Sequence, residues 1–200
     1  KEYSLRSLNS ICINIRNAKK KLKNINFFLK IIDDNSKPKV IKLIKKIAIK
    51  NNIAFELSSL DIDKYENKMK FSNNRRMLAH NSHIFQSKEY ALNSKYDLLY
   101  FVEDDYIHQP DAIEEMIYSY EKFSTIYKKD IIMCPSDYPF LYNKFEHTNI
   151  LTGYKKHWRR VNESLCTYLI SHNTLKINWK TYEKMFLNNF DPYEKPLHEL

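Results

Sequence analysis

The sequence has almost no glycine: Gly153 is the single example in 200 residues. It therefore contains neither the G-x-x-x-x-G-K-S/T loop of P-loop enzymes nor the G-x-G-x-x-G turn of Rossmann dinucleotide-binding proteins. Neither class has support from the sequence. A bound phosphate group would have to be held by a metal ion, by basic side chains or by a helix N-terminus.

Cysteine is also scarce. Cys12, Cys134 and Cys166 are far apart, odd in number and flanked by apolar residues. This pattern predicts buried free thiols in a reducing compartment, and no Cys/His spacing suggests a zinc site.

The chain lacks an apolar run near the ~20 residues that a membrane-spanning helix needs, and no signal peptide is visible. We therefore expect a cytoplasmic protein, with peripheral association at the inner face of a membrane left open. We also expect that the sequence is trimmed at its N-terminus.

Basic residues outnumber acidic ones, with a net charge of +9. This charge is compatible with binding to nucleic acid, to an acidic membrane surface or to an anionic small substrate. The abundance of Lys, Asn, Ile and Tyr equally fits the codon bias of an AT-rich genome. With 43% hydrophobic residues, the chain can bury a core of its own, which suits a single domain over residues 1–200.

Apolar periodicity predicts helices that alternate with buried strands through residue 135. The expected helices are 4–23, one that Pro38 opens, one that Ser72 caps and one that Pro110 opens. The expected strands are 25–32, 53–57, 97–102 and 131–134, with a polar loop at 61–71. This order predicts an α/β fold, with a mostly parallel sheet flanked by helices.

The last third of the chain is less regular. Residues 150–172 predict strands that include 166–171, residues 175–189 predict a helix, and the segment that follows reads as a loop. The sequence thus favours a smaller, irregular β region after the first half, with a division near residue 135.

Three consecutive carboxylates, Glu103, Asp104 and Asp105, follow the most apolar predicted strand. They repel one another, so they need a counter-charge, and a divalent cation is a natural one. Mg²⁺ and Mn²⁺ are commonly held by one or two carboxylates together with substrate phosphates. A solvated acidic turn before a helix is the alternative, because acidic residues also favour a helix N-terminus.

Two segments carry a resemblance to a known family. YFVEDDYIHQPDAIEEMI, over 100–117, resembles the strand, Glu-Asp-Asp motif and Pro-Asp-started helix of GT-A glycosyltransferases. Its nearest likeness is the Golgi N-acetylglucosaminyltransferase that starts complex N-glycans, with family 2 a looser match. INFFLKIIDDNS, over 25–36, resembles the strand and acidic turn that hold the nucleotide. The resemblance covers about residues 5–135 and lacks the glycines frequent in family 2.

The resemblance implies a GT-A-type, Rossmann-like sheet whose first half, residues 1–135, binds a nucleotide sugar. It implies that Asp105 is the main metal ligand. Glu103 is the second metal candidate and lies closer to the sugar, while Asp104 contacts the ribose. The implied base-binding residues are Asp33, Asp34 and Asn35, although the residues alone also fit a plain turn.

Basic residues supply further candidates. Similar enzymes place such groups from the third helix near the nucleotide, which points to Arg76 and His83; a solvated helix face is the alternative. His157, Trp158 and Arg159 fall where similar enzymes have an acceptor-side loop in the half from residue 136 to 200. A Trp can stack on a sugar ring, and it can equally be buried in a surface strand.

A carboxylate that deprotonates the acceptor hydroxyl is implied for an inverting enzyme. The first choice is Asp191, followed by Glu163. Asp137 and Glu194 stay open, as does His198 as a late metal ligand.

Together these observations predict a Mn²⁺- or Mg²⁺-dependent glycosyltransferase, expected to be inverting, in glycan or surface-polysaccharide synthesis. Its expected partners are a nucleotide-diphosphate sugar donor and a glycan, lipid-linked or protein acceptor, without nucleic acid. Two other classes stay open. One is a sugar-phosphate nucleotidyltransferase, and the other is a non-enzymatic basic module that binds nucleic acid or membranes.

Overall fold

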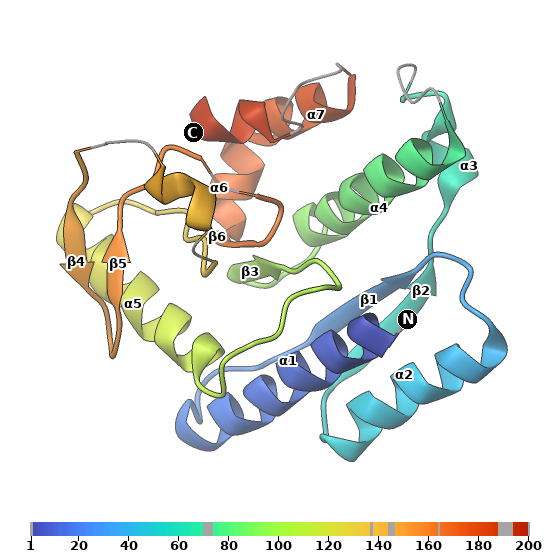
Figure 1. Ribbon diagram of the computed structural model, residues 1–200, viewed down its shortest axis with the longest axis horizontal. Helices are drawn as coiled ribbons and strands as arrows, with labels where there is room; N and C mark the ends of the chain where they lie inside the picture. Colours follow the sequence, from blue (N-terminus) through green and yellow to red (C-terminus); the bar gives the residue numbers. More distant parts are fainter. Residues whose placement is uncertain are drawn as a thin grey trace.

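Helices and short strands alternate along most of the chain (Figure 1). The computed structural model describes residues 2–69, 74–136, 138–143, 147–163, 165–187 and 194–199. Its α-helices are α1 (Glu2–Lys21), α2 (Pro38–Lys50), α3 (Ile62–Glu66), α4 (Arg75–Leu92), α5 (Ala112–Tyr127), α6 (His172–Ile177) and α7 (Trp179–Leu187). Its strands are β1 (Leu29–Asp33), β2 (Phe55–Ser59), β3 (Leu98–Phe101), β4 (Ile150–Thr152), β5 (His157–Arg159) and β6 (Tyr168–Ser171). Two 3₁₀ turns complete the described elements, η1 (Pro139–Tyr142) and η2 (Lys195–Glu199).

Local sequence signals explain several helix boundaries. Pro38 opens α2, where its missing N–H costs nothing. The side chain of Asn74 accepts a hydrogen bond from the backbone N–H of Met77 at 2.9 Å and so caps α4. The predicted cap, Ser72, lies outside the described residues. Ser171 caps α6 by accepting from the Thr174 N–H at 3.0 Å.

The strands form three two-stranded sheets. β1 and β2 are parallel, with Leu29 opposite Phe55. β3 pairs antiparallel with β6, and β4 pairs antiparallel with β5. The prediction of an α/β chain is therefore confirmed. A continuous, mostly parallel sheet is not formed by the described residues, because the partner that β3 takes among them is an antiparallel strand from late in the chain.

The predicted strand at 131–134 is reduced to a single bridge. Met133 and Leu169 exchange two backbone hydrogen bonds of 3.0 and 2.8 Å, so β6 lies between β3 and Met133. On the other side of β3, no described residue forms a ladder with it. β1 likewise pairs only with β2 among the described residues.

Two hydrophobic clusters form the core. In the first, buried residues of α1 and α5 such as Ile11 and Met116 pack with Leu169 of β6, and side chains of β1 and β3 pack against them. In the second, Tyr65 of α3 packs with α4, β6 and the C-terminal helices, including Tyr182. Both clusters cross residue 135, so the two predicted halves share their core, and the division there stays a prediction.

Three element predictions are corrected. Residues 61–71 were expected as a loop, but they contain α3, whose N-cap Asp61 accepts from the Lys64 N–H at 3.2 Å. The helix predicted at 175–189 is two helices, α6 and α7, separated at Asn178. The loop expected at the end of the chain contains η2. None of the described helices combines the length and apolarity needed to span a membrane.

Candidate functional site

The three acids after β3 lie in different surroundings. Glu103 is half-buried: its backbone N–H donates to the Thr167 hydroxyl at 3.1 Å, and that hydroxyl donates to Glu103 Oε2 at 3.1 Å. Asp104 is exposed and accepts from Ser4 Oγ of α1 at 2.6 Å. Asp105 is exposed and makes no hydrogen bond or ion pair with any other described residue. The triplet is thus divided, and Asp105 is the member that remains open to a ligand.

A buried lysine lies behind Glu103. Lys88 of α4 is 1% exposed, and its Nζ lies 4.7 Å from the ring centre of Phe101 and 5.4 Å from that of Tyr168. Burial lowers the pKa of Lys88, while the Glu103 and Glu194 carboxylates oppose that shift. When Lys88 is protonated, its charge offsets part of the repulsion within the acidic triplet.

Opposing effects act on the pKa of the Glu103 carboxyl group. Burial raises the pKa of its carboxyl group, and the neighbouring charges of Asp105 and Glu194 raise it further. The hydrogen bond from Thr167 and the charge of Lys88 act in the opposite direction. Since Glu103 is hydrogen-bonded to the buried Thr167, we assign it to the inner wall of the site.

Glu194 joins the same cluster from the far end of the chain. Its Oε1 accepts from Cys166 Sγ at 3.5 Å, and its charge acts on Lys88 and Glu103. The η2 turn that follows it is anchored by Leu197, which is buried in the second core cluster. Glu194 was one of the alternatives for the acceptor base, and the fold brings it near the acidic triplet.

Helix α1 fastens the loop that carries the acids. Ser10 Oγ accepts from the His108 backbone N–H at 3.0 Å. Buried Asn14 donates to the Gln109 carbonyl at 2.5 Å and accepts from the Ile113 N–H at 3.2 Å. Together with the Ser4–Asp104 bond, these contacts hold both ends of the loop. The signal that could have revealed them is a stripe of small polar residues on α1 at helical spacing.

The second acidic turn follows β1. Asp33 Oδ2 accepts from the Ser36 backbone N–H at 2.8 Å, while Asp34 is exposed and Asn35 has a positive φ of 52°. These are the features of an ordinary Asx turn. No hydrogen bond or ion pair joins this turn to Glu103, Asp104 or Asp105 in the described part of the chain. Its role in binding a base stays a prediction.

The two candidates on α4 have separate surroundings. His83 Nε2 lies 2.9 Å from the carbonyl oxygen of Ile32, so this ring supports the end of β1. Arg76 is exposed in the first turn of α4. His83 therefore has a structural contact, and Arg76 is the more accessible of the two for an anionic ligand.

The acceptor-side candidates belong to the β4–β5 hairpin, which a buried carboxylate organises. Glu115 of α5 is 4% exposed and accepts from the backbone N–H groups of Tyr154, Lys155 and Lys156 at 3.1, 2.6 and 3.3 Å. Trp158 Nε1 donates to the same carboxylate at 3.0 Å. A Cβ on Gly153 would lie 2.6 Å from Glu115 Oε1, so the single glycine permits this close approach.

This arrangement restricts what the hairpin can do. The Trp158 indole packs edge-on against Phe123, 6.5 Å between ring centres, so part of the ring serves the core. His157 is exposed, and the Arg159 guanidinium lies 4.5 Å from the ring centre of Tyr142. Sequence reasoning identified the hairpin residues but did not identify Glu115 as the residue that binds them.

The predicted acceptor bases are only partly described. Asp191, the first choice, and Asp137 lie outside the described residues. Glu163 is half-buried in the connection between β5 and β6, and His198 is half-buried in η2. Their predicted roles stay predictions.

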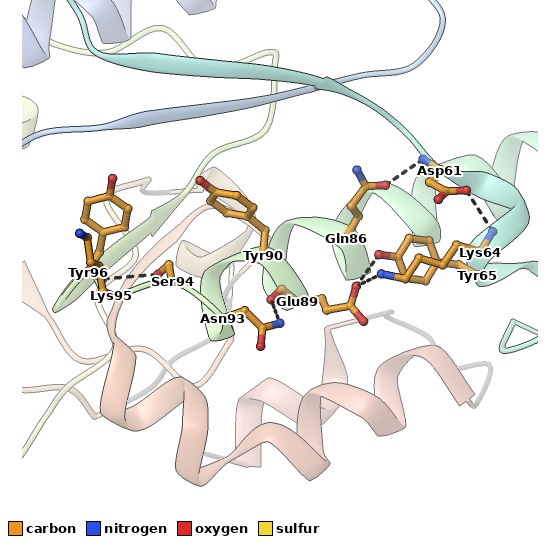
Figure 2. Close-up of a pocket in the computed structure, with 10 residues that line it drawn as sticks. All are labelled: Asp61, Lys64, Tyr65, Gln86, Glu89, Tyr90, Asn93, Ser94, Lys95 and Tyr96. Carbon is orange, nitrogen blue, oxygen red and sulfur yellow. Dashed lines mark hydrogen bonds and ion pairs between the residues drawn. The ribbon is translucent and has the colours of Figure 1, made fainter.

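A surface groove of about 570 Å³ lies between α3, α4 and the turn after α4 (Figure 2). Its polar groups already bind one another: Tyr65 Oη and Lys64 Nζ both donate to Glu89 Oε2 at 2.6 Å. Neither acidic turn lines it. We therefore interpret this groove as a polar seam between helices and not as the ligand site.

The described residues form no group of three or more His, Cys, Asp or Glu side chains able to enclose a metal ion. A cation held mainly by substrate phosphates needs only one or two protein carboxylates. Exposed Asp105 could be such a carboxylate, with Asp104, bonded to Ser4, beside it. A metal ion shared with a phosphate at this place stays a prediction. Comparison of the chain with protein-family models, curated proteins and solved structures finds no significant match.

We predict that Glu115→Gln loosens the hairpin. Glutamine has one acceptor oxygen where the carboxylate has two, so buried N–H groups lose partners at a cost of about 1–3 kcal/mol. Chemical unfolding followed by Trp fluorescence measures this loss. Glu121→Gln, an exposed change on the same helix, is the control and should alter stability by less than about 0.5 kcal/mol.

The Glu115 effect should also depend on pH. Burial alone raises the pKa of Glu115, but hydrogen bonds from Trp158, Ser119 and the backbone outweigh it and hold the pKa below the ordinary 4.5. A carboxylate with a lowered folded-state pKa stabilises above its unfolded pKa and loses that contribution as pH falls through the folded one. The stability difference between wild type and Glu115→Gln should therefore shrink below about pH 4.5. A difference independent of pH would contradict the assignment.

We also predict that Lys88→Met raises the pKa of Glu103 further, because it removes the positive charge that opposes burial. Carbon-detected NMR titration of the Glu103 carboxyl measures the change. Methionine fills similar volume among the aromatic rings, so the fold should survive. Lys95→Met, at an exposed position, is the control; an equal Glu103 titration in all three proteins would show that Lys88 does not act on it.

Proposed function

We propose that this chain is a metal-assisted glycosyltransferase of GT-A type, which uses a nucleotide-diphosphate sugar as donor. The observation that carries the proposal is the division of the acidic triplet after β3. Glu103 is held inward by its hydrogen bonds with Thr167, and the charge of buried Lys88 acts on it, while Asp105 stays accessible. This is the arrangement expected of a residue that shares a cation with a diphosphate.

The chemistry follows from the accessible carboxylates. When a nucleotide sugar departs from its diphosphate, negative charge grows on the leaving group. A Mn²⁺ or Mg²⁺ ion between that diphosphate and the protein would neutralise it. In the proposed site Asp105 is the main protein ligand and Asp104, fixed by Ser4, contacts the ribose or the ion's water shell. Glu103 positions the loop and is not the main ligand of the ion.

The resemblance of residues 25–36 and 100–117 to GT-A enzymes supports the same function. The structure adds that both segments contain a strand followed by an acidic turn: β1 with Asp33, and β3 with Glu103. Side chains of both strands pack on one core cluster. A sheet that includes both strands is part of the proposal.

Transfer to an acceptor needs a base to remove the hydroxyl proton. Glu194 is a candidate because its carboxylate accepts a hydrogen bond from Cys166 and its charge acts on Glu103, so it lies near the acidic triplet. Asp191 and Glu163 remain the candidates from the sequence. The acceptor is proposed as a glycan, lipid-linked or protein hydroxyl, near the β4–β5 hairpin.

Calorimetry with MnCl₂ and a panel of nucleoside diphosphates tests the proposal. We expect one or more nucleotides to bind in the presence of Mn²⁺, with affinity at least about tenfold weaker in Asp105→Asn. Asp63→Asn, an exposed acid on α3, is the control and should bind as wild type.

The outcomes separate the alternatives. Absence of metal-dependent nucleotide binding, or binding that Asp105→Asn leaves unchanged, would overturn the proposal. Release of pyrophosphate from a nucleoside triphosphate and a sugar phosphate would instead identify a nucleotidyltransferase.

A further inference from the structure

The positive charge of the protein is concentrated in one segment. Residues 16–50 contain 12 of the 33 basic residues and two of the 24 acidic ones, which gives them a net charge of +10. The whole chain has a net charge of +9. A general excess of lysine codons would spread the charge, so its concentration needs a further explanation.

Helix α2 presents four of these 12 basic residues on its outer face. Ile44 and Ala48 are buried against the core. On the opposite side, four lysines recur at helical spacing, and all are exposed: Lys39, Lys42, Lys46 and Lys50. Ile49 lies on the same face and is 67% exposed. We call these five residues the α2 outer face.

Among the described residues, no acid neutralises the α2 outer face. The helix contains no Asp or Glu, and its lysines form no ion pair with any described residue. The C-terminal end of α1 adds to the charge, because α1 and α2 pack side by side (Figure 1). Lys19 Nζ donates to the Asn52 carbonyl just beyond α2, at 3.3 Å, which places the lysines that end α1 beside the end of α2.

We propose that the α2 outer face docks on an anionic lipid bilayer. Each lysine near such a surface contributes favourably, and several on one face suffice for reversible adsorption. The exposed Ile49 among these lysines can enter the boundary between head groups and acyl chains, as apolar residues of interfacial helices do. This surface function is separate from the nucleotide site, because none of its residues belongs to either acidic turn.

The composition of the face favours lipid over nucleic acid. It has no arginine to bind a base or phosphate bidentately, and no aromatic ring on which a base could stack. Lysines act as point charges with little directional preference. Such groups match a fluid array of head groups, whereas the apolar Ile49 has no counterpart on a phosphate backbone.

Flotation with phosphatidylcholine vesicles, with and without phosphatidylglycerol, tests the proposal. We expect binding only to the anionic vesicles, and weaker binding at raised salt. The triple variant Lys39→Gln, Lys42→Gln and Lys46→Gln should bind about 100-fold more weakly. The control removes the same charge elsewhere, as Lys129→Gln, Lys176→Gln and Lys180→Gln, and should lose much less affinity.

A second variant probes insertion. Ile49→Ser keeps the charge and should weaken vesicle binding about tenfold, with greater sensitivity to salt. Thermal unfolding of all variants verifies that the exposed changes leave the fold intact. The proposal would be overturned if the two triple variants bound anionic vesicles equally well. It would also be overturned if wild type bound neutral vesicles as tightly as anionic ones. Binding of RNA or duplex DNA through the same lysines without vesicle binding would also overturn it.

Discussion

The structure around the candidate site depends on the mutual repulsion of three consecutive carboxylates. Adjacent acids at the end of a buried strand cannot share one environment without compensation. Here Glu103 is hydrogen-bonded to the buried Thr167, and Asp104 is held by Ser4 of α1. Because two of the acids have partners within the protein, Asp105 can remain exposed.

This division makes distant parts of the chain interdependent. Thr167 is fully buried and immediately precedes β6, which pairs with β3. Glu194 reaches the same cluster through Cys166. The geometry of the acidic loop thus depends on residues more than 60 positions later in the chain, which explains why the two predicted halves share a core. A substitution in β6 should therefore perturb the acidic loop more than it perturbs α2.

Periodicity predicted the long helices well, because α1, α2, α4 and α5 each bury one face on which apolar residues recur at helical spacing. It failed where the signal is short or the partner is remote. The five residues of α3 are too few to show a period. The choice of β6 as the partner of β3 is a long-range event that no local pattern encodes.

The three acids of the candidate site, Glu103, Asp104 and Asp105, were identified as a run in the sequence, and their roles stay predictions. Lys88 was missed because lysine is normally a surface residue. Its position offered a signal: Lys88 follows Ile84 by four residues and precedes Ala91 by three, on the buried face of α4. Glu115 escaped attention for a similar reason, since its partners are backbone N–H groups of a hairpin that the sequence does not place.

The α2 outer face and the acidic loop suggest two kinds of recognition in one small protein. The α2 outer face concentrates positive charge on a helix of which only the inner side packs against the core. The acidic loop, which is hydrogen-bonded to α1, presents negative charge. If both proposals hold, the enzyme would act on a nucleotide sugar from solution while its basic face rests on a membrane, which fits a lipid-linked or membrane-proximal acceptor.

A crystal structure with Mn²⁺ and a nucleoside diphosphate, with the ion located by its anomalous signal, tests the central claim most directly. The account predicts an ion at coordination distance from an Asp105 carboxylate oxygen and from the diphosphate, with Glu103 still bound to Thr167. An ion held elsewhere, or a nucleotide bound away from the acidic loop, would contradict it.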